Sequence, residues 1–135
     1  MQTRKKILVV DDSPDFQMLV KAFVTEEDYV VLTASDTLQA TGSAIRDKPA
    51  LIVVDIGLPG GDGWMLLDRL KANSITRHIP VVVVTGQTNP GLAEKAQAKG
   101  ATTFLNKPID KPTLLAIFNQ FLSQPPQVPK ANSSS

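Results

Sequence analysis

The sequence contains no cysteine and only one histidine, one tryptophan and one tyrosine. Without cysteine the chain can form neither disulfides nor thiolate metal sites, and this composition fits a reducing compartment. The single histidine, His78, has no second histidine beside it. It is therefore a poor candidate for a zinc ligand or a phosphorelay donor.

Long apolar runs and an excess of one charge are also missing. The N-terminal "MQTRKK" is followed by only four apolar residues, "ILVV", which is too short for the apolar region of a signal peptide or for a membrane span. The 14 basic and 13 acidic residues give a net charge of +1, which does not favour binding to nucleic acid or to a membrane surface. We therefore expect a cytoplasmic domain that binds neither nucleic acid nor a membrane.

The length and composition predict one globular domain. The chain has 135 residues, of which 42% are hydrophobic and 20% charged, values that allow one sizeable core. The C-terminal "SQPPQVPKANSSS" is rich in proline and serine and has no apolar period. We expect residues 1–123 to form the domain and residues 124–135 to be a flexible tail or linker.

Short apolar segments alternate with segments of helical period. Five of them predict strands: Lys6–Val10, Tyr29–Ala34, Leu51–Asp55, Pro80–Thr85 and Thr102–Asn106. The helices predicted between and after them begin after Ser13, near Asp36, after Gly63, near Gly91 and near Asp110. Five strand–helix repeats predict an α/β fold, a doubly wound five-stranded parallel sheet of the (βα)5 type with helices on both faces.

The inward faces of the helices follow from apolar spacing. In the first helix, Ser13 is the predicted N-cap and Pro14 the first helical residue. Its predicted core stripe is Phe16, Leu19, Val20, Phe23 and Val24. In the weaker second helix the predicted inward residues are Leu38, Thr41 and Ile45, and in the third Met65 is assigned to the core. Gly63, just before the third helix, is expected where a side chain would obstruct a turn.

Polar residues follow the strands that a parallel sheet would place at its centre. Asp11 and Asp12 end the first strand, Asp55 the third and Thr85 the fourth, and the fifth runs into Lys107. In such sheets ligands bind beyond the carboxyl ends of the strands. Clustered carboxylates repel one another unless a cation relieves them, and Mg²⁺ prefers oxygen ligands of this kind. Together with an ammonium and a hydroxyl group, they form a suitable site for a phosphoryl group.

Four segments carry a family resemblance. "VVDDS", "VVDIGLPGGDGWMLLDRLK", "VVVVTG" and "FLNKP" occur in order on the five-fold strand–helix pattern. With them the chain resembles the receiver domain of two-component response regulators over Lys6–Leu122. The resemblance implies the flavodoxin-like strand order 2-1-3-4-5. It also implies a signalling phosphoacceptor, which catalyses only its own phosphorylation and dephosphorylation.

The resemblance implies a role for each residue of the site. Asp55 would accept a phosphoryl group from a histidine kinase or a phosphotransfer protein. Asp12 and Asp55 would bind Mg²⁺ directly, Asp11 would act mainly through a metal-bound water, and the backbone carbonyl of Gly57 would be the third protein ligand. Lys107 would pair with the phosphoryl group.

Switching is implied in the same way. Thr85 would move its hydroxyl toward the phosphoryl group. Phe104, which matches the family's switch aromatic, would then turn inward. If Phe104 is only a core residue, it has no part in switching. The Lys107–Pro108 peptide would be cis. The change would act on a downstream partner or on an output domain.

Two alternatives to this function remain open at this level. A Mg²⁺-dependent phosphatase of the aspartyl-phosphate type would need a second carboxylate two residues after Asp55, where this sequence has Gly57. A degenerate receiver could act only as a protein-binding module, although the complete set of site residues argues against lost chemistry. The kinase, the pathway and the output are not readable from the sequence, which fits both a stand-alone receiver and part of a longer regulator.

Overall fold

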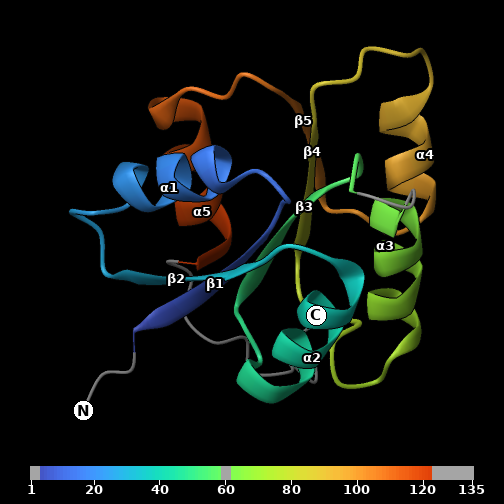
Figure 1. Ribbon diagram of the computed structural model, residues 1–135, viewed down its shortest axis with the longest axis horizontal. Coiled ribbons are helices and arrows are strands. Elements are labelled where there is room, and N and C mark those ends of the chain that lie inside the picture. The colour runs from blue at the N-terminus through green and yellow to red at the C-terminus, as the bar shows by residue number, and fades with distance from the viewer. Residues whose placement is uncertain (1–3, 59–61, 123–135) are drawn as a thin grey trace, which may run out of the picture.

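The computed structural model describes residues 4–58 and 62–122. The predicted tail, residues 124–135, lies outside these residues, so the domain boundary stays a prediction. Strands and helices alternate along the described chain (Figure 1). The strands are β1 (Lys5–Val10), β2 (Tyr29–Ala34), β3 (Leu51–Asp55), β4 (Val81–Thr85) and β5 (Thr103–Asn106). The helices are α1 (Pro14–Phe23), α2 (Thr37–Asp47), α3 (Asp62–Ala72), α4 (Leu92–Ala98) and α5 (Lys111–Leu122).

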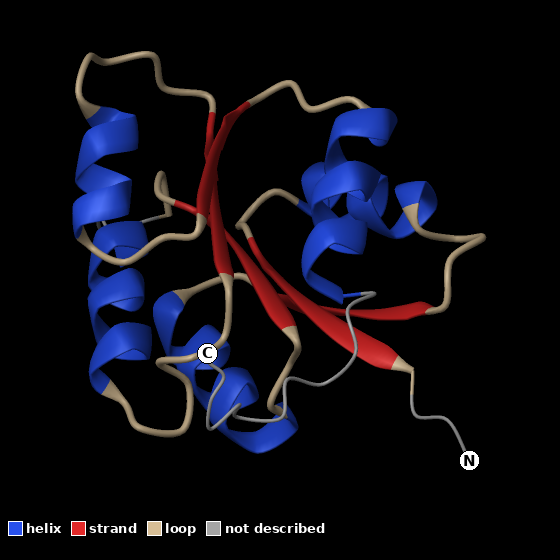
Figure 2. Ribbon diagram, turned by 180° about the vertical axis from the view of Figure 1, so that it is seen from behind, coloured by secondary structure: helices blue, strands red, loops and turns tan. Residues whose placement is uncertain are grey.

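The strands form one parallel sheet in the order β2-β1-β3-β4-β5, which confirms the predicted fold class (Figure 2). The register aligns the carboxyl ends of neighbouring strands. Val10 of β1 pairs with Val54 of β3, and Thr85 of β4 pairs with Asn106 of β5. The residues that follow β1, β3, β4 and β5 therefore meet at one edge of the sheet, as the sequence predicts.

Helices cover both faces of the sheet, with α1 and α5 on one face and α2, α3 and α4 on the other (Figure 1). Side chains alternate between these two cores along each strand. In β1, Ile7 and Val9 pack with α1 and α5, whereas Leu8 and Val10 pack toward the other face. Every residue of β3 and β4 is buried, as expected for central strands of a parallel sheet.

Helix α1 begins as the sequence predicts. The Ser13 hydroxyl accepts a hydrogen bond from the N–H of Phe16 at 3.3 Å, and Pro14 occupies the first helical position, where its missing N–H costs no intrahelical bond. This cap fixes the start of α1 at Pro14, four residues after β1 ends at Val10. The turn between them carries Asp11 and Asp12.

The predicted inward face of α2 is wrong. Leu38 is 81% exposed, while Thr41 and Ile45 are only half-buried. The buried residues are instead Thr37, Ala40, Ser43 and Ala44. Small side chains let this helix lie close to the sheet and to α3, which explains why the larger apolar residues were a misleading guide.

Two further core assignments are corrected. Met65 is 44% exposed because the adjacent Leu66 and Leu67, one helical step away, occupy the inward face of α3. Leu19 of α1 is 40% exposed and borders a groove next to the site, on the face of the sheet that α1 and α5 cover. Within residues 4–58 and 62–122, no helix is both long and apolar enough to cross a membrane.

Candidate functional site

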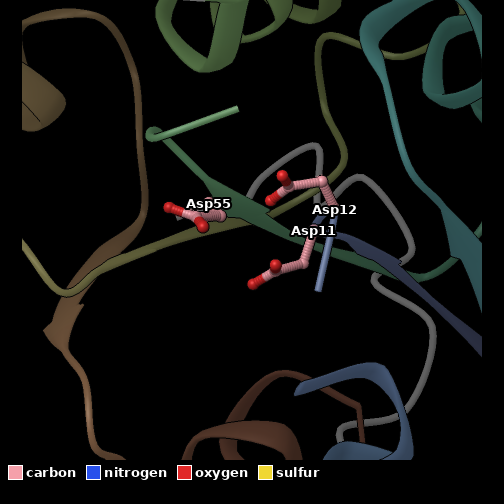
Figure 3. A group of neighbouring side chains, drawn as sticks. All are labelled: Asp11, Asp12 and Asp55. Atoms are coloured by element: carbon pink, nitrogen blue, oxygen red, sulfur yellow. The ribbon is translucent and has the colours of Figure 1, made fainter. Parts of the chain in front are cut away.

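Three carboxylates gather where β1 and β3 end (Figure 3). Oxygens of Asp11, Asp12 and Asp55 all lie within 4.8 Å of one another. Asp11 is fully buried and Asp55 is 8% exposed, while Asp12 faces solvent. The parallel register brings these groups together although the two strands are some forty residues apart in sequence, a separation evident from their bounds.

Lys107 supplies the positive charge of this cluster. Its Nζ lies 2.6 Å from Oδ2 of Asp11 and 3.3 Å from Oδ2 of Asp55, and 4.3 Å from the ring centroid of Phe16. The Lys107–Pro108 peptide is cis, as the resemblance predicts. Burial works to lower the pKa of Lys107, but the hydrogen bond and charge of Asp11, with the charge of Asp55, raise it overall. The lysine is therefore held in its charged form.

Asp11 is the carboxylate whose ionised form is most disfavoured by burial in this site. Burial raises the pKa of its carboxyl group, an effect opposed by hydrogen bonds from Lys107 and from the N–H of Ser13, the latter at 2.8 Å. Three carboxylates face one ammonium group, so an excess of negative charge remains. A hard divalent cation with oxygen ligands would offset this excess, and the donor set therefore fits Mg²⁺ better than a metal that prefers nitrogen or sulfur.

Asp55 is held by its own loop as well as by Lys107. The N–H of Gly57 donates to Oδ1 of Asp55 at 2.8 Å, which leaves Oδ2 on the side of the lysine. A Cβ at position 57 would lie 3.3 Å from that Oδ1 and 3.7 Å from Nε2 of Gln87. Glycine thus leaves the space beside the carboxylate free. That the backbone carbonyl of Gly57 is a metal ligand stays a prediction.

Thr85 and Phe104 lie on the strands next to Asp55. Thr85 is 1% exposed and ends β4, and its hydroxyl oxygen accepts a hydrogen bond from the N–H of Gln87 at 3.0 Å. Phe104 of β5 pairs with Val83 and packs against the core on the α4 side. The structure thus brings four predicted residues into one cluster: Asp11, Asp12, Asp55 and Lys107. Thr85 lies at the end of the adjoining strand β4, and Phe104 lies on β5, farther from the cluster.

Two residues of the site had no predicted role. The side-chain amide of Gln17 donates to the backbone carbonyl of Asp11 at 2.7 Å. That of Asn106 donates to the backbone carbonyl of Gln87 at 2.8 Å. A role for Asn106 in the site could have been predicted, because it is a polar residue at a strand end, directly before Lys107. No spacing rule predicts that a side chain in α1 reaches back six residues to Asp11.

Comparisons with known proteins agree with this geometry. Residues 7–119 match the family described as response regulator receiver domain. Response regulator PleD of Caulobacter vibrioides is 42% identical over 111 residues, which are 82% of this chain and 24% of PleD, so the chain spans about a quarter of that relative. Protein PilH of Pseudomonas aeruginosa is 31% identical over 118 residues, covering 87% of this chain and 98% of PilH.

A solved structure gives the same picture. The receiver domain of the sensor histidine kinase PA1611 from Pseudomonas aeruginosa, determined with a magnesium ion coordinated in its active site cleft, superposes with a TM-score of 0.80. It is 27% identical in sequence, and the match covers 90% of this chain and all of that domain, 100%.

Proposed function

This chain belongs to the response regulator receiver domain family, a group of signalling domains, and from that premise we propose that Asp55 is its phosphoacceptor. A carboxylate oxygen of Asp55 attacks the phosphorus of a phosphohistidine on a kinase or phosphotransfer protein. The P–N bond breaks, its electron pair stays on the imidazole, which takes up a proton, and an acyl phosphate forms on Asp55. The observation that carries this proposal is the position of the Lys107 ammonium between Asp11 and Asp55, at 2.6 Å and 3.3 Å.

The proposed metal ligands are the carboxylates of Asp12 and Asp55 and the backbone carbonyl of Gly57, with Asp11 acting as an indirect ligand. When bound there, Mg²⁺ would neutralise the phosphoryl oxygens and the clustered acids. The chain's own groups would do the rest. Lys107, held in its charged form, would pair with a phosphoryl oxygen, and the buried Thr85 hydroxyl would donate a hydrogen bond to another.

A groove beside the site suggests how the phosphodonor docks. It measures about 520 Å³ and is bordered by Phe16 and Leu19 of α1 and by the Lys107–Ile109 segment. A helix of the partner that rested an apolar face in this groove would lie next to the ammonium group of Lys107. Its phosphohistidine would then reach Asp55 along one edge of the sheet. We therefore assign the groove to the kinase or phosphotransfer protein.

The proposed switch uses Thr85 and Phe104. To reach a phosphoryl oxygen, the Thr85 hydroxyl would give up its hydrogen bond from the Gln87 N–H. Phe104 borders two cavities of about 220 Å³ each, one toward the β4–α4 loop and one under α4. These cavities give the ring room to change position, and α4 lies against β5 mainly through small side chains such as Ala96. A downstream protein or an output domain would read this change.

The proposal is tested by intact-mass spectrometry after incubation with Mg²⁺ and a small phosphodonor. The wild-type chain should gain one phosphoryl group that survives acid and is lost in base, as expected for an acyl phosphate. Asp55→Asn should gain none, because its amide is not a nucleophile. Asp36→Asn, at the exposed cap of α2, is the matched control and should be labelled like the wild type. A full label on Asp55→Asn would reject the assignment.

A further inference from the structure

Asp11 is fully buried, and each of its hydrogen-bonding positions has a partner. Its N–H donates to the carbonyl of Ala34 at 3.0 Å. Its carboxylate accepts from the N–H of Ser13 at 2.8 Å and from Lys107 at 2.6 Å. Its backbone carbonyl accepts from the side-chain amide of Gln17 at 2.7 Å. Asp11 and the turn that it begins are therefore fixed from four directions.

Gln17 differs from the other three partners. The Ala34 and Ser13 contacts are made by backbone atoms, and Lys107 belongs to the proposed site itself. Gln17 contributes only a side chain, from a helix that is anchored separately. Its own N–H donates to the carbonyl of Ser13 at 3.2 Å. The Gln17 amide thus links the end of β1 to the first turns of α1. A substitution at Gln17 can remove this hydrogen bond and leave the other backbone hydrogen bonds and the carboxylates of the site in place.

The bond to Gln17 acts on Asp12. The carbonyl of Asp11 belongs to the planar peptide that joins it to Asp12, so fixing its oxygen fixes the direction in which Asp12 leaves the turn. Among residues 4–58 and 62–122, no group donates a hydrogen bond to the Asp12 carboxylate. The aim of this exposed carboxylate therefore depends on its backbone.

We infer that Gln17 is a positioning residue for the metal site, one that holds the Asp11–Asp12 peptide so that the Asp12 carboxylate faces Asp55. This inference rests on the proposed function, because it assumes that these carboxylates bind Mg²⁺. Groups that orient metal ligands from outside commonly change the metal affinity by a factor of about 10 to 100 when they are replaced.

The test compares Gln17→Met with the wild type by calorimetric titration with Mg²⁺. Methionine has a similar length and helix propensity but cannot donate a hydrogen bond. We expect the dissociation constant for Mg²⁺ to rise by about tenfold in Gln17→Met. Gln120→Met, at an exposed glutamine of α5, is the matched control and should bind Mg²⁺ like the wild type.

Hydrogen exchange gives a readout that needs no metal. The N–H of Ser13 donates within the same turn, to the carboxylate of Asp11, so it should exchange faster in Gln17→Met. The amides of Val82 and Val83, in the buried strand β4, should keep their wild-type protection. Faster exchange confined to the turn would support a positioning role over a general structural one.

Each contrary outcome has a defined meaning. If the wild-type chain binds no Mg²⁺, the proposed function fails and this inference fails with it. If the wild type binds Mg²⁺ and Gln17→Met binds it within twofold of the same affinity, only the inference about Gln17 is overturned. Equal weakening in Gln120→Met, or loss of protection at Val82 and Val83 in Gln17→Met, would overturn it as well.

Discussion

Replacing Gly63 with alanine should lower the free energy of unfolding by about 3 kcal/mol, at the high end of the effect of overpacking a core. A Cβ at this buried position would lie 2.2 Å from Cα of Ile56 and 2.7 Å from the backbone oxygen of Asp55. These are backbone atoms, which cannot turn aside as the end of a flexible side chain can. The start of α3 would have to move away from the loop that follows β3, and Asp55 would shift with it.

Urea unfolding followed by circular dichroism measures this effect. Gly42→Ala is the matched control, because Gly42 lies inside α2 with no atom within 4 Å of the added Cβ. There the same substitution should raise the free energy of unfolding by up to about 1 kcal/mol through helix propensity. Equal stability of Gly63→Ala and the wild type would show that α3 tolerates displacement, contrary to the close contact described here.

Asp11→Asn should make the metal-free chain more stable in EDTA, by on the order of 1 kcal/mol, because it removes the charge of a buried carboxylate. The wild-type protein buries an ionised carboxylate beside two others, and burial raises the pKa of Asp11 in spite of its bond to Lys107. Asparagine removes that charge, and its oxygen can still accept the hydrogen bond from the N–H of Ser13. Lys107, which is partly exposed, keeps Asp55 as its partner.

Added Mg²⁺ should reverse the order of stability. A ligand that binds only the folded state at 100 times its dissociation constant stabilises it by about 2.7 kcal/mol. The wild type should gain about this much, whereas Asp11→Asn, with one carboxylate fewer, should gain far less. Asp36→Asn is the control, because asparagine caps a helix as well as aspartate does, and it should follow the wild type under both conditions. Urea midpoints that shift equally with Mg²⁺ in all three proteins would contradict this prediction.

Acid should abolish the difference in EDTA. Because the pKa of Asp11 is raised in the folded state, the folded protein holds this proton to higher pH than the unfolded chain does. Its contribution to stability is therefore lost as the pH rises from the ordinary carboxyl range through the raised pKa. The advantage of Asp11→Asn should be complete above the raised pKa and should disappear below the ordinary carboxyl range. Unfolding curves in EDTA over this pH range measure it.

The sheet and its polar edge could be predicted because they depend on strong local signals. Runs such as Leu51–Asp55 are apolar without alternation, as buried parallel strands are, and Ser13 with Pro14 marks a helix start. Once the strands are parallel, their carboxyl ends must meet, so Asp55 and Lys107 had to come near each other. That convergence needs only the order of the elements.

The errors arose where a local pattern does not contain the answer. Leu38 was expected inside because it is apolar, but the face of α2 that packs is made of small residues, and the sequence of one helix does not say how close its neighbours lie. Gln17 was missed for a related reason. Its contact with Asp11 depends on how α1 crosses the end of β1, which only the tertiary structure gives.

The dependence of phosphorylation on magnesium tests the central claim most directly. The wild-type chain is incubated with a fixed concentration of a small phosphodonor over a range of Mg²⁺ concentrations, and the phosphorylated fraction is measured by intact mass. The account predicts that labelling rises with Mg²⁺ as expected for a single site and is nearly absent in EDTA, because the acids around Asp55 otherwise repel the phosphoryl group. Labelling of Asp55 at the same rate in EDTA as in saturating Mg²⁺ would contradict it.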